Sequence, residues 1–256
     1  MRVFLIDKNK IIRIILVIFL VTSSLIYTNI NRDEIISVFS VKKELPIYSV
    51  DTDEKKIAIS FDAAWGDQYT KQILDILDKY NVKTTFFLVG FWVDRYPDMV
   101  KEIVKRGHEI GNHSTNHHHM TKLSQEQIIK ELKETEDKIK KITGKKTILF
   151  RPPFGDYNDK LIRTCKNNGY YVIQWDVDSL DWKELGVEPV VDRVLRNVKK
   201  GSIVLFHNNA KYVTKYLPII IEKLQAKGYK IVPVSELIYK ENYYIDNTGR
   251  QIKREN

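Results

Sequence analysis

Four side chains of types that perform hydrolytic chemistry follow apolar runs in this chain. Asp62 and His207 each end such a run, and His113 and His117 lie four residues apart after another. A carboxylate can take a proton from water, and an imidazole can donate a proton or bind a metal ion. The spacing of four can direct two imidazoles at one divalent ion, although residues 117–119 also form a histidine run of a kind found in exposed loops. These residues favour a metal-assisted hydrolase.

Two further clusters in the sequence contain Arg151 and the pair Asp181 and Trp182. Two prolines follow Arg151 and fix the backbone there, which suits the wall of a shaped pocket, but a structural ion pair would use the same arginine. Trp182 has a polar surrounding that suits a surface for stacking sugars, and a half-buried tryptophan is equally ordinary. Asp62 has an alternative role too, as a cap for the next helix.

Strand-like and helix-like segments alternate through the middle of the chain, which predicts an α/β fold with a parallel sheet or barrel. About seven such units indicate a distorted, incomplete (β/α) barrel, and an open doubly wound sheet is the alternative. In a parallel barrel the chemistry gathers where strands end, as these clusters do. No glycine-rich phosphate loop follows a strand, which argues against a nucleotide binder. The expected strands are residues 56–61, 84–89, 109–111, 147–150, 170–177, 202–206 and 230–234.

Helical periodicity and end signals predict the segments between the strands. Ser124 and Gln127 form a capping-box pattern that opens a long helix, and Gly144 is its expected stop. The expected helices are residues 69–80, 97–105, 124–142, 158–168, 189–198 and 212–227.

Composition limits the partners that this protein can have. The net charge of +9 fits either a lysine-rich solvated surface or attraction to an anionic surface such as a membrane face or cell wall. No basic run interleaved with aromatic residues occurs, so no nucleic-acid partner is expected. Cys165 is the single cysteine, which rules out an intrachain disulfide and a cysteine metal site. The oligomeric state is not indicated.

The amino-terminal residues predict a membrane address. Residues 1–13 carry a basic flank, and residues 14–30 are mainly apolar and near the lower length limit for a spanning helix. The positive-inside rule places the flank in the cytoplasm and the remaining chain outside the cell membrane, as a single-pass protein. A cleaved signal peptide is the alternative. Residues 31–55 are expected to form a stalk, and residues 240–256 a polar tail that frays.

Five motifs in order make the chain resemble the polysaccharide deacetylase family, which has the NodB homology domain and is carbohydrate esterase family four. They contain Asp62, the histidine pair 113–117, Arg151, Asp181 and His207, and the resemblance covers residues 56–239. Together with the anchor, the run 61–67 most resembles the sporulation-associated PdaB-like branch. The family fold is a distorted, incomplete (β/α) barrel.

The resemblance implies a role for each matching residue. Asp62 matches the catalytic base and Arg151 the arginine that orients it. His207 matches the general acid, tuned by Asp181 with Asp178 as the other candidate. The remaining matches are two metal ligands, an oxyanion donor through its backbone N–H and two walls of the acetyl pocket, which are, in that order, His113, His117, Phe154, Trp182 and Leu205.

One position departs from the family pattern. Family members usually have a second aspartate after the base, which ligates the metal, and here this position is Ala63. Two histidines leave a zinc ion one protein ligand short, and Asp67 is a candidate replacement that more simply begins the next helix. The expected function is removal of N-acetyl groups from amino sugars of a cell-wall polysaccharide, peptidoglycan in particular, with zinc as the divalent ion. The alternatives are a catalytically impaired, membrane-tethered glycan-binding or structural protein and a hydrolase of other amides.

Overall fold

The computed structural model describes residues 8–30 and 43–254, and these divide into two separate units. The first contains helix α1 (Lys8–Ile30), which is long and apolar enough to cross a membrane by length and composition. Its candidate span is Lys8–Tyr27, with a mean hydropathy of 2.1. A signal sequence passes the same test, so both alternatives for this segment stay open. Most of the predicted stalk, residues 31–42, lies outside the described residues.

The second unit is built on a curled parallel sheet, which confirms the incomplete barrel and excludes the open doubly wound sheet. The strand order is β6-β5-β4-β3-β2-β8-β7, and β9 pairs with the first half of β2. Every pairing within this sheet is parallel. The strands are β2 (Lys56–Ala63), β3 (Thr85–Leu88), β4 (Glu109–Asn112), β5 (Leu149–Phe150), β6 (Tyr171–Val172), β7 (Val177–Asp178), β8 (Ile203–His207) and β9 (Lys230–Val232).

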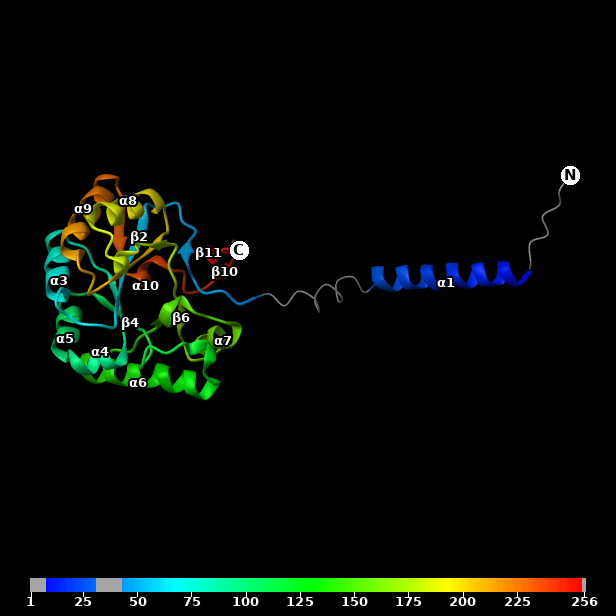
Figure 1. Ribbon diagram of the computed structural model, residues 1–256, viewed down its shortest axis with the longest axis horizontal. Coiled ribbons are helices and arrows are strands. Elements are labelled where there is room, and N and C mark those ends of the chain that lie inside the picture. The colour runs from blue at the N-terminus through cyan, green and yellow to red at the C-terminus, as the bar shows by residue number, and fades with distance from the viewer. Residues whose placement is uncertain (1–7, 31–42, 255–256) are drawn as a thin grey trace. The chain divides into compact units, whose positions relative to one another are not determined.

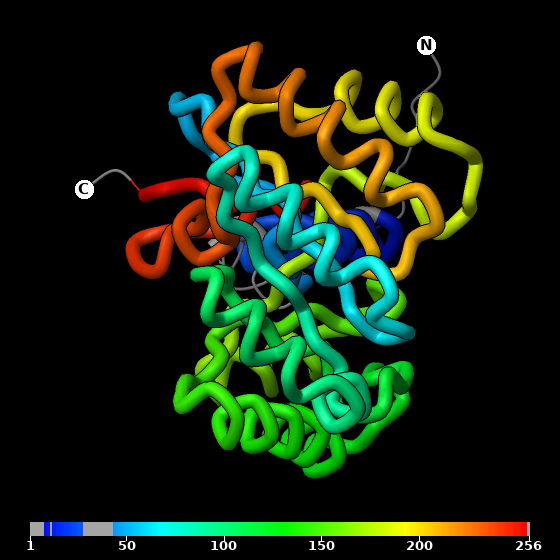
Figure 2. The backbone as a smooth tube through the Cα atoms, turned by 90° about the vertical axis from the view of Figure 1, so that its left-hand side faces the viewer, coloured from blue at the N-terminus to red at the C-terminus, as the bar shows by residue number. Residues whose placement is uncertain are grey.

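Helices cover the sheet because the connections between successive parallel strands contain most of them. Neighbouring helices pack in the order α8, α9, α3, α5, α6 and α7, and Figure 2 shows α9, α3 and α5 lying side by side. The helices are α3 (Thr70–Lys79), α4 (Gly90–Arg95), α5 (Pro97–Lys105), α6 (Gln125–Thr143), α7 (Asp159–Asn167), α8 (Val187–Asn197), α9 (Val213–Ala226) and α10 (Val234–Leu237). Three short 3-10 turns complete the unit, η1 (Met120–Lys122), η2 (Pro153–Gly155) and η3 (Asp181–Lys183).

The end signals of α6 are those that the sequence predicts. The Ser124 side chain accepts from the backbone of Gln127, whose side chain accepts in turn from the backbone of Ser124. Gly144 ends the helix with φ 72°, a conformation that glycine adopts without a Cβ penalty. The short helices α4 and α10 are missing from the predicted elements, and the predicted strand 170–177 is two short strands, because one turn of helix or two bridging residues leave little periodic signal.

The folded unit extends beyond both boundaries that the sequence predicts. It begins at Glu44 rather than at residue 56, because Ile47 and Val50 are buried against the barrel. Strand β1 (Ser49–Val50) pairs with β11 (Arg250–Lys253), which pairs with β10 (Tyr243–Ile245). Figure 1 shows β10 and β11 next to the barrel at the carboxyl end. The final segment is therefore a paired hairpin and not a frayed tail, since its backbone groups are satisfied within this small sheet.

Candidate active site

The predicted site residues come together at the carboxyl ends of the strands, around one cavity of about 510 Å³. Neighbouring parallel strands end at the same edge of the sheet, so residues far apart in sequence meet there. Eight of the nine line the cavity, namely Asp62, His113, His117, Phe154, Asp181, Trp182, Leu205 and His207. The ninth, Arg151, lies behind Asp62, fully buried.

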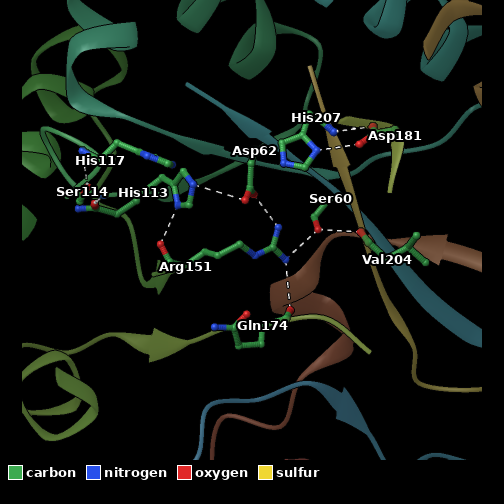
Figure 3. A network of polar contacts seen from close by, with 11 residues as sticks. Ser60, Asp62, His113, Ser114, His117, Arg151, Gln174, Asp181, Val204 and His207 are labelled. Atoms are coloured by element: carbon green, nitrogen blue, oxygen red, sulfur yellow. Dashed lines mark hydrogen bonds and ion pairs between the residues drawn. The ribbon is translucent and has the colours of Figure 1, made fainter. Parts of the chain in front are cut away.

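A buried ion pair fixes the carboxylate of Asp62 (Figure 3). The Arg151 Nη1 donates to Asp62 Oδ1 at 2.7 Å, and Nη2 donates to Ser60 Oγ at 2.8 Å and to the backbone oxygen of Gln174 at 3.3 Å. The guanidinium also lies over the ring of Phe87, 4.0 Å from its centroid. These contacts hold Arg151 in one orientation, so Asp62 is positioned by a rigid partner.

The same surroundings decide the charge of Asp62. Burial opposes its ionisation, but Arg151, together with His113 and His207, outweighs burial and lowers the pKa of Asp62 below its ordinary value. The helix cap that the sequence left as an alternative is excluded, because the Asp62 carboxylate bonds to Arg151 and lies near His113. Asp62 is therefore an ionised carboxylate that opens onto the cavity, which is the state a general base requires.

His113 has a defined proton position. Its Nδ1 lies 2.7 Å from the backbone oxygen of Arg151, and a carbonyl only accepts, so Nδ1 carries the proton. Burial lowers the pKa of His113, which keeps the ring neutral. The unprotonated Nε2 then points at Asp62 Oδ2 across 3.4 Å. Two acceptors facing each other are a natural place for a cation or a proton.

His117 lies beside this pair and is also neutral. Burial lowers its pKa to about 4. Its ring centroid is 5.1 Å from that of His113 and 4.6 Å from that of Phe154. The backbone of His117 has φ 55°, a left-handed conformation, and its N–H donates to Ser114 Oγ at 3.0 Å. A tight loop rather than a helix therefore brings the two imidazoles together.

A buried carboxylate that the sequence analysis missed holds this loop. Glu131 of α6 is 8% exposed, and its Oε2 accepts from the backbone N–H groups of Thr115 and Asn116 at 2.8 and 2.9 Å. Its Oε1 accepts from the side chain of Asn116 at 2.7 Å. The available signal is its place in α6, where it lies among the apolar residues that face the core, next to Leu132. A charge on the apolar side of a helix needs a buried partner.

On the other side of the cavity, His207 and Asp181 form a second pair. Asp181 Oδ1 lies 2.7 Å from His207 Nδ1, and Oδ2 accepts from the backbone N–H of His207 at 2.9 Å. Tyr216 of α9 donates to the same Oδ2 at 2.7 Å. Burial favours neutral His207, but Asp181, aided by Asp62 and Asp178, outweighs burial and raises its pKa above the ordinary value. The raised pKa favours the protonated ring, which is the form that a general acid needs.

Asp178, the other candidate for this tuning role, makes a different contact. Its Oδ1 accepts from the backbone of Leu180 at 2.8 Å, so Asp178 shapes the loop while Asp181 contacts His207. The sequence analysis missed Tyr216, which is one of many apolar or aromatic residues on its helix. Nothing in its spacing separates it from ordinary core residues.

Two imidazoles, those of His113 and His117, are the side chains available to bind a metal ion. Among residues 8–30 and 43–254, no three His, Cys, Asp or Glu side chains are grouped so that they could hold an ion. Ala63 is fully buried in the core, and Asp67 does not line the cavity. The backbone oxygen of Asp67 instead accepts from the N–H of Thr70 at 2.9 Å, so Asp67 lies in the turn before α3, which begins at Thr70. The neutral rings fit a divalent ion in donor chemistry, without a third protein ligand.

Three of the residues that line the cavity are apolar or aromatic, and two of these are exposed. Phe154 is 60% exposed and has φ 60°, and the ring of His119 stacks on it at 4.3 Å. Trp182 is 56% exposed, whereas Leu205 is buried in the cavity floor. The stacked ring of His119 therefore supports Phe154.

Comparison with known proteins agrees with the fold and with the family. The model of the polysaccharide deacetylase family matches residues 49–173. A peptidoglycan-N-acetylglucosamine deacetylase of Bacillus cereus is 40% identical over 196 residues, which cover 75% of this chain and 92% of that protein. The structure of Bacillus subtilis PdaA, a family 4 carbohydrate esterase, has a TM-score of 0.72 at 32% identity and covers 75% of this chain and 84% of that one.

A further solved structure is also similar to this chain. It is a pseudoenzyme of carbohydrate esterase family four from Bacillus anthracis, with a TM-score of 0.73 at 36% identity over 75% of this chain and 68% of that chain. A mutant of that protein with restored enzymatic activity has the same TM-score. Assignment to the PdaB-like branch stays a prediction. The length of the matches and their identity establish the family, and the chain belongs to the polysaccharide deacetylases.

Proposed function

We propose that this protein is a hydrolase that removes N-acetyl groups from amino sugars of a cell-wall polysaccharide, with peptidoglycan as the substrate. The observation that carries the proposal is that one cavity is lined by both Asp62, which is bonded to Arg151, and His207, which is bonded to Asp181. Relatives named as peptidoglycan deacetylases, such as the Bacillus cereus protein, support the substrate class.

The proposed reaction begins with Asp62 as the base. Its carboxylate takes a proton from a water molecule that attacks the acetamide carbonyl carbon, while Arg151 holds it in place through the 2.7 Å hydrogen bond. The backbone N–H of Phe154 is the proposed donor to the oxygen that becomes negative. Trp182 and Leu205, which line the cavity, are the proposed walls around the acetyl methyl group.

His207 completes the reaction on the opposite side. Its protonated ring donates to the nitrogen of the amino sugar as the C–N bond breaks, and Asp181 stabilises the charged ring until then. The products are acetate and a free amine. His113 and His117 are the residues that would hold a divalent ion, zinc in this proposal, and the ion would supply polarisation of the carbonyl.

Release of acetate from acetylated peptidoglycan tests the proposed function. The full chain is treated with a chelator and reloaded with zinc, and acetate is measured in both states. We expect acetate from the zinc-loaded protein and little from the chelated one. No acetate at any zinc concentration, from a protein whose folding is shown by circular dichroism, contradicts the proposal.

The two-donor metal site favours a second candidate, a glycan-binding protein without turnover. Ala63 is the observation behind it, and the similar pseudoenzyme of the same family supports it. Acetate release combined with a sedimentation assay separates the two candidates. A glycan-binding protein without turnover would sediment with peptidoglycan and release no acetate from it.

The proposed location is the cell membrane. Residues 14–30 are the proposed single-pass anchor, residues 1–13 the cytoplasmic flank, and the folded unit lies on the outer side, where peptidoglycan is. The apolar helix α1 supports this, and so do relatives that act on the wall. Fractionation of cells followed by mass determination distinguishes an intact anchor from a cleaved signal peptide.

A further inference from the structure

The exposed aromatic side chains of the folded unit are concentrated at the active-site cavity. In residues 44–254 the strongly exposed aromatic residues are Trp65, Phe154, Trp182 and Tyr244, and the first three line the cavity. Trp65 is 60% exposed although it is among the largest apolar side chains. Aromatic surface left in water at a cavity marks a place for a ligand with an apolar face.

Trp65 is held rigidly despite its exposure. The backbone oxygen of the next residue, Gly66, accepts from Trp92 Nε1 at 2.7 Å and from Asn208 Nδ2 at 2.8 Å. The Trp65 ring packs against Phe91 with centroids 5.1 Å apart, and it lies 6.2 Å from the ring of His117. A ring already fixed by its neighbours loses little conformational entropy when it binds a ligand.

The order of the strands places Trp65 and Trp182 on opposite sides of the catalytic pair. Trp65 follows β2 and packs on residues that follow β3 and β4, whereas Trp182 follows β7 at the other edge. The ends of β2 and β8, which carry Asp62 and His207, lie between those two groups of strands. A ligand that contacts both rings must therefore pass across the catalytic groups.

Exposed aromatic rings on both sides of the catalytic pair suit a chain of linked sugars. Flat C–H faces of sugars stack on aromatic rings, and Asp178 and Glu184 line the same cavity as acceptors for hydroxyl groups. We propose that Trp65 is a binding surface for a second sugar unit, one that flanks the unit being deacetylated, so that the enzyme acts on units within a glycan chain. This inference rests on the proposed function.

Substitution of Trp65 tests the inference by its dependence on chain length. Trp65→Ala is compared with the wild type on N-acetylglucosamine oligomers of two and six units and on 4-nitrophenyl acetate, a small ester that reaches only the acetyl pocket. We expect kcat/KM on the six-unit oligomer to fall about tenfold, in KM more than in kcat, with the ester unchanged. Trp65→Phe should retain part of the preference for the longer chain.

Tyr244→Ala is the matched control, because it removes another exposed aromatic side chain, one that lies in the hairpin. It should leave kcat/KM unchanged on the oligomers and on the ester. An equal loss on the ester and on the oligomers would show that Trp65 only supports the fold of the site, and an unchanged six-unit rate would also overturn the inference.

If the wild type releases no acetate from any oligomer, the proposed function fails separately. Calorimetric binding of the six-unit oligomer then decides the inference. Binding about tenfold weaker in Trp65→Ala than in the wild type supports it, whereas equal affinity of the two proteins, or no binding by the wild type, overturns it.

Discussion

The two sides of the cavity differ in how many of their hydrogen-bonding atoms have partners within the protein. On the acid side, the Asp181 carboxylate has three hydrogen-bond partners, which are the backbone N–H of His207, the ring Nδ1 of His207 and the Tyr216 hydroxyl. Both of its oxygens therefore have partners. On the histidine side, His113 Nε2 faces Asp62 Oδ2 with no donor between them, and the next residue in the chain is Ala63.

This difference shows which parts of the site fold without a ligand. Hydrogen bonds that close within the protein hold the base and the acid in position in the chain alone. On the histidine side, by contrast, His113 Nε2 and Asp62 Oδ2 are two acceptors 3.4 Å apart, which can share a partner only when a cation or a proton lies between them. Whether the protein hydrolyses its substrate or only binds glycan therefore depends on the histidine side and not on the acid side.

Asp62→Asn gives the largest expected effect on the proposed activity. The amide cannot take a proton from water, so kcat should fall by about 10²–10⁴ while the fold persists. Acetate release and circular dichroism measure the two quantities. Asp67→Asn is the control, since Asp67 lies outside the cavity, and it should keep wild-type activity. Equal activity of wild type and Asp62→Asn would break the assignment of the base.

Ala63→Asp tests the incomplete histidine side. Ala63 is fully buried, so an unpaired carboxylate there should destabilise the chelated protein by about 3 kcal/mol. Zinc should recover this loss if the new carboxylate completes the site with His113 and His117. Thermal unfolding with chelator and with zinc measures the effect, and an equal zinc shift in wild type and variant would exclude a shared ion.

Glu131→Gln weakens the support of the histidine loop. In the variant an amide nitrogen, which is a donor, would replace a carboxylate oxygen and face the donor Asn116 Nδ2. A buried polar group without a partner costs about 1–3 kcal/mol. Urea unfolding should show that loss, with zinc affinity reduced as well. Glu134→Gln on the outer side of α6 is the matched control and should change neither quantity.

Asp181→Asn sharpens the comparison from the acid side. Because Asp181 raises the pKa of His207, its neutral replacement should lower that pKa. A general acid must be protonated, so the alkaline limb of the kcat profile should move to lower pH. Each unit of movement lowers activity above the limb about tenfold. A limb that stays in place would assign it to a group other than His207.

Ser124→Ala has the smallest expected effect and lies outside both sides of the cavity. Loss of the capping box should cost about 1 kcal/mol of stability, measured by urea unfolding. Activity at a temperature well below unfolding should equal that of the wild type. A change in kcat here would mean that α6 transmits its stability to the loop 113–117.

Sequence patterns predict the framework of the site well. Strand β2 is mainly apolar up to Phe61, directly before Asp62, and α6 carries both of its end signals, so local chemistry decides these elements. The five motifs also fall at strand ends, where a parallel sheet brings them together. The residues that support the motifs are harder to predict. Glu131, Tyr216 and Trp65 have a role only through contacts with residues distant in sequence.

The amino-acid sequence predicts the barrel through its periodicity, and it predicts the family and nine candidate site residues through motifs that resemble those of the family, because both kinds of pattern can be read along the chain without the fold. Tertiary structure decided that Asp181 and not Asp178 contacts His207, that Asp67 lies off the cavity, and that residues 44–55 and 240–253 belong to the folded unit. Hydrogen-bond partners and burial depend on segments that meet only after folding, and no local pattern records them.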